Sequence, residues 1–275
     1  MKVKKSLELK NKYVFTRAKK SLGQNFLKSE MALKKIIETG EIKPDDIILE
    51  IGPGKGKLTE KLLEKAELVI AVEKDRELFE FLKIKFEKEI TEKKLFLIRE
   101  DILKFEITKL TRQDLASYKI IANIPYNITG AILKKFLTEK NQPSLMILML
   151  QHEVAQRIIA TPRHGVVNGK ESILSISVKA YGEPKMIMKV PARYFSPVPK
   201  VDSAIISIKN ISRKIFEKND INEKKFWEIV KTGFAHKRKK LSSNLKYIGS
   251  SYIESLGNKR AEKLSLSDWI LLAKS

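Results

Sequence analysis

Cysteine is absent from the 275-residue sequence. Its absence excludes disulfide bonds, thiolate nucleophiles and zinc sites built on cysteine, and it fits the reducing conditions of the cytoplasm. Histidine is scarce too, because only His152, His164 and His236 are present, and their spacing is not that of metal ligands. We therefore expect a cytoplasmic protein that holds no metal ion.

Long apolar runs are missing as well. The longest one, Leu145 to Leu150, is far shorter than the roughly 20 residues that span a bilayer. The first residues, MKVKKSLELKNKY, are charged and lack the apolar segment of a signal peptide. These two absences predict a soluble protein that does not enter a membrane.

Acidic residues are the third deficit. The 33 Asp and Glu face 55 Lys and Arg, which leaves a formal net charge of +22. Residues 1–20 hold eight Lys or Arg and one acidic residue, and residues 209–275 hold sixteen Lys or Arg and seven acidic residues. A field of this sign favours a polyanionic partner, and nucleic acid before a membrane because no long basic amphipathic helix stands out. The alternative is a lysine-rich composition that serves solubility, with solvated tails.

Between these basic ends, strand-like and helix-like segments alternate, which is typical of a doubly wound, mostly parallel sheet. The expected strands are DIILEI, LVIAVE, LFLIRE, KIIAN and SLMILML, followed by PKMIMKV and SAIISIKN as a hairpin at the sheet's edge. Helices are expected from about residues 29, 57, 77, 130 and 151. The prediction is an α/β domain over residues 21–209, a basic arm over residues 1–20 and a small basic helical domain over residues 210–275.

A glycine-rich turn, EIGPGKG over residues 50–56, follows the first expected strand. Glycines there let the backbone approach a ligand closely and let the next helix pack on the strand. The spacing differs from the G-x-G-x-x-G of dinucleotide sites, and it resembles the S-adenosylmethionine loop of class I methyltransferases. Glu73 ends the second strand at a distance suited to ribose hydroxyls, and Asp101 follows the third strand. A nicotinamide enzyme, and helix capping by Asp101, are the alternatives.

The stretch KIIANIPYNIT, residues 119–129, ends a short apolar strand at Asn123 and continues through Pro125 into a turn. Open α/β sheets bind ligands at the carboxyl ends of their strands. There the Asn123 amide oxygen and the Ile124 carbonyl can accept from an exocyclic amine, while the Tyr126 ring offers a stacking face. Asn and Pro are also ordinary turn formers, so the tetrapeptide alone does not identify such a ligand.

Seven motifs in this order resemble those of the ribosomal RNA adenine N6,N6-dimethyltransferases: SLGQNFL, EIGPGKG, Glu73, Glu100-Asp101, NIPYNIT, MLQHEVAQR and FSPVPKVDSA. The match covers about residues 19–208, and the basic FAHKRKKLSSNL resembles the family's tail. SLGQNFL and NIPYNI are closer to the branch that modifies the small ribosomal subunit than to the resistance enzymes that modify the large one. Thr129-Gly130, His152 and Val198 depart from the family's habit without removing a group that the chemistry needs.

This resemblance implies a class I methyltransferase, Rossmann-like fold that binds S-adenosylmethionine. The implied cofactor contacts are Asn25, Leu27, Gly52, Gly54, Glu73, Asp101 and Asn123. Among them, Glu73 would hold the ribose, Asp101 the adenine, and Asn123 would lie between cofactor and substrate. The implied catalytic turn is Asn123, Ile124, Pro125 and Tyr126.

For the substrate, the resemblance implies adenines of small-subunit ribosomal RNA, dimethylated at N6 by a monomer that takes part in assembly of that subunit. A flipped adenine would stack between Tyr126 and Phe195, for which the alternative is a core aromatic. The RNA backbone would contact Lys237, Arg238, Lys239 and Lys240, for which the alternative is a solvated helix face. The rival functions are methylation of large-subunit RNA and a non-catalytic RNA-binding assembly or transcription factor.

Overall fold

The computed structural model describes residues 18–107, 117–160, 169–246 and 251–274. The chain divides into two compact units, residues 1–152 with 186–209 and residues 153–185 with 210–275. The expected boundary near residue 209 separates these units. Residues 153–185, expected in the sheet domain, group instead with the second unit. Most of the expected basic arm lies outside the described residues.

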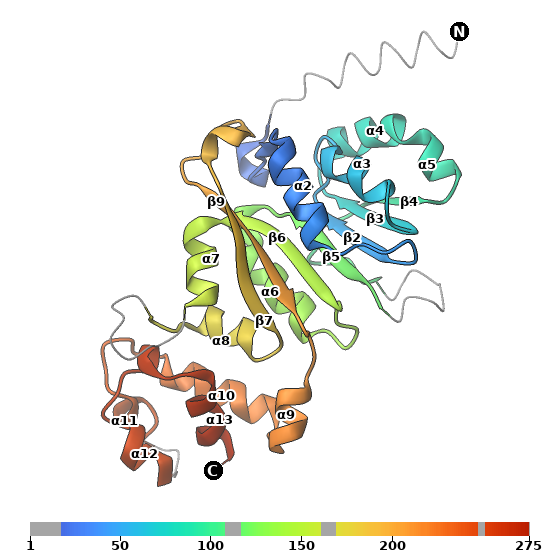
Figure 1. Cartoon of the computed structure of the whole chain (residues 1–275). Helices are drawn as coiled ribbons and strands as arrows, with labels where there is room; N and C mark the ends of the chain where they lie inside the picture. The colour runs from blue at the N-terminus through green and yellow to red at the C-terminus, as the bar shows by residue number, and fades with distance from the viewer. Residues whose placement is uncertain (1–17, 108–116, 161–168, 247–250, 275) are drawn as a thin grey trace, which may run out of the picture. The chain divides into compact units, whose positions relative to one another are not determined.

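A seven-stranded sheet forms the centre of the first unit, in the order β4-β3-β2-β5-β6-β9-β7 (Figure 1). Its strands are β2 (Ile47–Ile51), β3 (Leu68–Glu73), β4 (Leu95–Arg99), β5 (Lys119–Asn123), β6 (Leu145–Gln151), β7 (Glu183–Val190) and β9 (Ser203–Lys209). Neighbours from β4 to β6 run parallel, and β9 runs antiparallel to β6. The mostly parallel, Rossmann-like sheet is confirmed, with β7 at the edge and β9 beside it.

The strands are nearly continuous apolar runs because side chains on both faces of the sheet are covered. Every residue of β2 and β3 is buried. The helices that connect the strands are α2 (Glu30–Thr39), α3 (Lys57–Leu63), α4 (Arg76–Lys85), α5 (Glu87–Thr91) and α6 (Thr129–Thr138). The strand order reverses between β2 and β5, and this switch point is where an open α/β sheet leaves a crevice for ligands.

Local sequence explains where the helices near this crevice begin. Ser29 caps α2 by accepting from the backbone N–H of Ala32 at 3.3 Å. Gly56 precedes α3 with a φ of +74°, and a Cβ there would lie 2.6 Å from the Phe86 ring. Only glycine therefore suits both the backbone conformation and the close packing at this position.

A second, two-stranded sheet pairs β1 (Phe26–Leu27) with β8 (Phe195–Ser196), antiparallel. Short 3₁₀ turns precede both strands, η1 (Lys20–Leu22) and η4 (Ala192–Tyr194). The backbone N–H of Lys28 also donates to the Tyr194 carbonyl at 2.8 Å. The predicted loop SLGQNFL is thus fastened to a segment that follows it by about 170 residues in the sequence.

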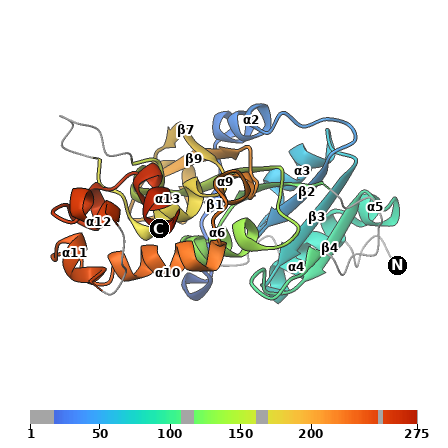
Figure 2. The same ribbon diagram turned by 90° about the horizontal axis from the view of Figure 1, so that it is seen from below.

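The second unit is helical. Its helices are α7 (His152–Ile159), α8 (Ile173–Lys179), α9 (Lys214–Asn219), α10 (Glu223–Gly233), α11 (Leu241–Asn244), α12 (Ser251–Leu256) and α13 (Leu266–Lys274), of which Figure 2 shows α10 to α13 from below. The apolar face of α10 is buried at Phe226 and Val230, and Phe234 stacks on Trp269 with ring centroids 5.4 Å apart. None of the described helices is both long and apolar enough to cross a membrane.

Candidate active site

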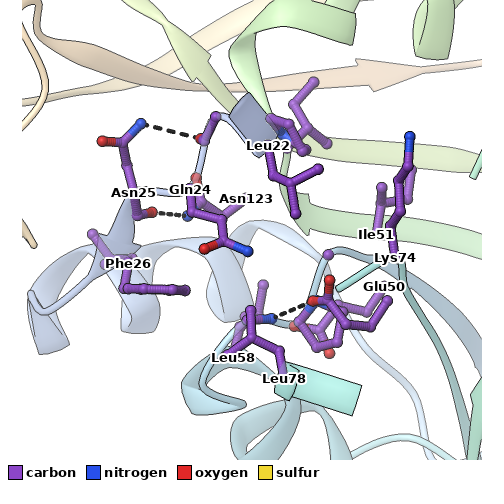
Figure 3. Close-up of a pocket in the computed structure, with 18 of the residues that line it drawn as sticks. Leu22, Gln24, Asn25, Phe26, Glu50, Ile51, Leu58, Lys74, Leu78 and Asn123 are labelled. Carbon is purple, nitrogen blue, oxygen red and sulfur yellow. Dashed lines mark hydrogen bonds between the residues drawn. The ribbon is translucent and has the colours of Figure 1, made fainter. Parts of the chain in front are cut away.

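A cavity of about 410 Å³ lies in the first unit at the carboxyl ends of the parallel strands. Its walls come from the SLGQNFL loop, the glycine turn after β2, the ends of β3 and β4, and the turn after β5. Figure 3 shows side chains of these segments around the cavity, with Asn25 and Asn123 on one side and Glu50 and Lys74 on another. The volume is within the range of small-molecule sites, about 300–1,000 Å³.

The glycine turn brings bare backbone to the cavity. Gly52 and Gly54 have φ angles of +65° and +60°, which residues other than glycine rarely adopt. A Cβ on Gly54 would lie 3.1 Å from the Phe26 ring, so the SLGQNFL loop packs directly on this turn. The Lys55 ammonium lies 5.1 Å from the centroid of the same ring. The turn therefore offers a ligand its backbone and an apolar neighbour.

Glu73, at the end of β3, presents a buried carboxylate held by backbone donors. Its Oε2 accepts from the N–H of Gly54 at 3.2 Å, and its Oε1 accepts from the N–H of Asp75 at 2.8 Å. Burial raises the pKa of Glu73 to about 7, although these N–H groups favour the charged form. Each oxygen keeps a lone pair, so the carboxylate can still accept from hydroxyl groups.

Asp101, two residues after β4, is a fixed and ionised carboxylate. Its Oδ2 accepts from the Lys74 ammonium at 2.8 Å, and its Oδ1 accepts from the backbone N–H of Leu103 at 3.0 Å. The hydrogen bond from Lys74, followed by that from Leu103, lowers the pKa of Asp101. The side chain is 24% exposed and lines the cavity. Such a group is an acceptor for an amine.

Asn123, at the end of β5, is oriented by the SLGQNFL loop. Its Nδ2 donates to the Asn25 carbonyl at 3.1 Å, which fixes the amide because a carbonyl only accepts. Among the described residues, no hydrogen bond occupies the Asn123 Oδ1. The next residue, Ile124, donates its N–H to the Met149 carbonyl at 3.1 Å. An amide oxygen thus remains available beside the cavity.

Tyr126 lies in the 3₁₀ turn η3 (Tyr126–Ile128), which follows Pro125. Its hydroxyl is 2.6 Å from the Ser203 hydroxyl, and this contact holds the ring in place. Burial raises the pKa of Tyr126, so the phenol stays neutral at neutral pH. Tyr126 lines the cavity, as does Asn123, which lies three positions before it in the sequence.

Ten of the predicted site residues line this one cavity. They are Asn25, Leu27, Gly52, Gly54, Glu73, Asp101, Asn123, Ile124, Pro125 and Tyr126. Phe195 does not join them. Its side chain is 0% exposed within the apolar core, among Leu27, Val190 and Ile205. The ring therefore has no face for a base here, and in this structure the expected stacking residue is a core aromatic.

The predicted backbone-binding cations form an exposed segment of the second unit, between α10 and α11. Asn244 shapes this segment, because its Nδ2 donates to the carbonyls of Gly233 at 2.6 Å and of His236 at 3.3 Å. The cations are Lys237, Arg238, Lys239 and Lys240. In the part of the chain that the structure describes, none of them takes part in an ion pair, and only Lys240 has a side-chain partner, the Asn258 amide oxygen at 3.1 Å.

Sequence reasoning missed the network that attaches the SLGQNFL loop to the residues that follow β3. Asp75 is only 4% exposed and accepts from Gln24 Nε2 at 2.9 Å and from Lys19 Nζ at 2.9 Å. Burial alone would raise the pKa of Asp75, but the Lys19 and Gln24 hydrogen bonds hold it below its usual value. The position of Asp75, two residues after Glu73, was the available signal.

Glu50, at the end of β2, was also missed as a site residue. Its side chain is buried, lines the cavity and accepts from the Thr59 hydroxyl at 2.6 Å. Burial raises the pKa of Glu50 to about 8, and the nearby Glu73 adds to the rise. Glu50 is therefore largely protonated near neutral pH. The sequence signal was its place directly before the glycine turn.

Comparisons with known proteins cover both units. A family model described as "Ribosomal RNA adenine dimethylase" matches residues 15–274. Two curated relatives carry the name "Ribosomal RNA small subunit methyltransferase A". The one from Dehalococcoides mccartyi is 40% identical over 263 residues, 92% of this chain and 86% of the relative. The one from Francisella tularensis is 40% identical over 265 residues, 94% of this chain and 97% of the relative.

Two solved structures are similar over nearly the same length. A dimethyladenosine transferase from Plasmodium falciparum is 26% identical with a TM-score of 0.73, and covers 90% of this chain and 95% of its own. The 23S rRNA methyltransferase ErmE is 25% identical with a TM-score of 0.67, and covers 91% of this chain and 98% of its own. The similarity therefore extends well beyond the residues that line the cavity.

Proposed function

The chain belongs to the ribosomal RNA adenine dimethylase family, and on this premise we propose that it methylates the N6 amine of adenines in small-subunit ribosomal RNA with S-adenosylmethionine. The product is N6,N6-dimethyladenosine, and the modification accompanies assembly of the small subunit in the cytoplasm. The enzyme acts as a monomer. The small-subunit target is supported by the names of the curated relatives from Dehalococcoides mccartyi and Francisella tularensis.

One observation carries the proposal. The Asn123 turn borders the same cavity as the carboxylates of Glu73 and Asp101. An acceptor for a substrate amine thus lies beside acceptors for a ribose and for a second amine. A nicotinamide enzyme has no use for the amine-binding turn, whereas a transferase that binds two adenine-containing molecules at once needs all three acceptors.

The cavity residues fit S-adenosylmethionine by their chemistry. Glu73 can accept from ribose hydroxyls, and Asp101 can accept from the exocyclic amine of an adenine. Gly52 leaves room for close approach, because a Cβ there would have no neighbour nearer than 3.9 Å. Asn25 and Leu27 are assigned to the methionine part. When bound, the cofactor supplies an electrophilic methyl group.

Asn123 and Ile124 prepare the substrate amine. The lone pair of an adenine N6 is delocalised into its ring, which makes the amine a poor nucleophile. By accepting its hydrogens out of the ring plane, the Asn123 Oδ1 and the Ile124 carbonyl localise the lone pair toward the methyl donor. The contact with Asn25 keeps the amide oxygen in this position. The product ammonium is acidic and loses its proton to water, so no general base is needed.

Tyr126 holds the flipped base. A base that leaves its stack needs an aromatic face, and stacking is worth about 1–3 kcal/mol per base. The Ser203 contact at 2.6 Å keeps the Tyr126 ring ordered before the base arrives. A second stacking face from Phe195 would require its ring to leave the core, so we assign base stacking to Tyr126 alone.

The test is methyl transfer to purified ribosomal particles that lack this modification. Wild-type protein and labelled S-adenosylmethionine are added separately to small-subunit and large-subunit particles, and the nucleosides are analysed by mass spectrometry. We expect N6,N6-dimethyladenosine in small-subunit RNA. Label only in large-subunit RNA would favour the rival activity, which the similarity to the 23S rRNA methyltransferase ErmE supports. RNA binding without any methylated adenine would instead favour a non-catalytic assembly factor.

A further inference from the structure

Lys74 is a cavity residue that neither the sequence motifs nor the proposed chemistry uses. It directly follows Glu73 at the end of β3 and lines the cavity, where Figure 3 shows its extended side chain. Its Nζ lies 2.8 Å from the Asp101 Oδ2. The ion pair joins the ends of two neighbouring strands, because β3 and β4 pair in register from Val69 with Leu95 to Glu73 with Arg99.

Two donors fix the Asp101 carboxylate. The Leu103 N–H holds one oxygen at 3.0 Å, and the Lys74 ammonium holds the other. The backbone donor is built into the turn, whereas the ammonium is the only side-chain hydrogen-bond donor to this carboxylate that the described residues provide. Lys74 is also the first cause of the lowered pKa of Asp101. A carboxylate held in this way is an acceptor with a fixed direction.

An ionised carboxylate can only accept hydrogen bonds. It therefore favours an exocyclic amine over an exocyclic oxygen on a purine ring. A carboxylate that rotates, or that gains a proton, loses part of this preference because a protonated oxygen can also donate.

We propose that Lys74 is a positioning residue for the cofactor, which holds Asp101 charged and aimed so that it selects the adenine amine of S-adenosylmethionine. The inference rests on the proposed function and deepens it. Lys74 acts on cofactor affinity and on the choice of purine, and it takes no part in the transfer step. Substitution of Lys74 therefore changes the cofactor KM and leaves kcat at saturating cofactor nearly unchanged.

Lys94 offers a matched control. Its side chain is 59% exposed, as is that of Lys74, and its Nζ lies 3.5 Å from the Glu92 Oε2. The Lys94 pair, however, lies at the start of β4 and does not line the cavity. Lys74→Met and Lys94→Met thus remove the same charge and keep the same aliphatic length in two different places.

The experiment measures binding by calorimetry of two probes, S-adenosylhomocysteine and its inosine analogue S-inosylhomocysteine. In Lys74→Met we expect the affinity for the adenine probe to fall about tenfold, the usual weight of one charge-assisted hydrogen bond. The affinity for the inosine probe should change far less, so the ratio of the two affinities shrinks. Lys74→Arg should restore most of the ratio, and Lys94→Met should bind as wild type does. Melting temperatures check that all variants fold.

A double-mutant cycle with Asp101→Asn tests whether Lys74 acts through Asp101. Once Asp101 is neutral, Lys74→Met should weaken adenine-probe binding by no more than about twofold, because the two changes remove one interaction. Additive losses, an equal loss for both probes, or unchanged binding by folded Lys74→Met would each overturn the inference. Wild-type protein that bound neither probe would overturn the proposed function itself, and the inference with it.

Discussion

The charged groups in the cavity of the first unit are held by hydrogen-bond partners, whereas those in the basic segment of the second unit, Lys237 to Lys240, are exposed. In the cavity, Glu73 accepts from two backbone N–H groups, and Asp101 is held by Lys74 and by a backbone N–H. In the segment from Lys237 to Lys240, every side chain is exposed, and no ion pair involves it within the described residues. Many lysines of the first unit, by contrast, lie within 4.0 Å of a carboxylate, as the Lys88–Glu92 and Lys61–Glu64 pairs do.

This difference separates two kinds of recognition. Fixed groups in a cavity act over hydrogen-bond distances and depend on direction, so salt affects them little. Unpaired cations on a surface attract a polyanion without reading its sequence, and salt weakens that attraction steeply. The protein should therefore lose chemistry and RNA affinity independently, depending on which region is changed.

The largest effect is expected from removing the Asn123 amide, which we propose accepts a hydrogen of the substrate amine. Asn123→Ala should lower the rate of methyl transfer by at least about 100-fold, because a preorganised polar group of this kind is worth about 100- to 1,000-fold in rate. RNA affinity, measured by filter binding, should remain nearly as in wild type, since the segment that we propose to bind the RNA backbone is untouched.

Asn219→Ala is the matched control for that variant. Asn219, on α9, makes the same kind of bond, from its Nδ2 to the Ile215 carbonyl at 2.8 Å. It lies in the second unit and does not line the cavity. The control should transfer methyl groups at the wild-type rate. An Asn123→Ala enzyme with wild-type activity would show that the mechanism does not need this amide. The cavity would then not differ from the basic segment in the way proposed.

A smaller effect, on affinity rather than on rate, is expected from the basic segment. Replacing Lys237, Arg238, Lys239 and Lys240 by Gln should weaken RNA binding roughly 10- to 100-fold near physiological salt. The slope of log affinity against log salt should become shallower by about 3, because each phosphate that a cation neutralises adds about 0.7–0.9 to the slope. The rate of transfer at saturating RNA should stay near that of wild type.

The control for this variant removes four lysines that already have carboxylate partners. Lys34, Lys61, Lys88 and Lys94 each pair with a glutamate. Their replacement by Gln changes the net charge by the same amount, yet it should affect RNA binding much less because their charge is locally compensated. Equal reductions of affinity in the two variants would mean that net charge alone governs binding, and that the basic segment is not special.

The sequence was sufficient for the features that depend on local pattern. Apolar runs bounded by turn residues predicted the strands, and the glycine spacing together with Glu73 and Asp101 predicted one ligand site at the strand ends. These predictions succeed because parallel strands in a doubly wound sheet place their carboxyl ends at one edge.

Features that depend on pairing between distant segments were not predictable in this way. The β1–β8 sheet joins two-residue strands far apart in the chain, and such short strands have no periodicity to detect. This sheet places Phe195 in the core, so the alternative of a core aromatic, rather than a stacking residue, describes Phe195 in this structure. The contacts of Lys19 and Gln24 with Asp75 were missed for the same reason, because side chains 56 and 51 residues apart meet only after folding.

The smallest effect concerns Glu50 in the cavity, because the ionised form of this buried side chain destabilises the fold. Burial raises the pKa of Glu50 to about 8 from its ordinary value of 4.5. The fold thus favours the protonated acid, and its contribution to stability is full below about pH 4.5 and is lost as pH rises toward 8. Glu50→Gln removes this titration, and its amide oxygen can still accept from the Thr59 hydroxyl.

The melting temperature of Glu50→Gln relative to wild type should therefore rise by several degrees between about pH 5.5 and about pH 8.5, because wild type loses the stability of the protonated Glu50 over this range. The measurement is thermal unfolding of the protein without cofactor. Glu87→Gln, whose side chain is exposed, controls for the change in net charge and should follow wild type at both pH values. If the difference in melting temperature between Glu50→Gln and wild type did not grow with pH, Glu50 would be ionised in the folded protein. The cavity would then hold the Glu50 carboxylate as a charge without a cationic partner among the described residues. In that respect it would resemble the basic segment, whose cations also lack charged partners in that part of the chain.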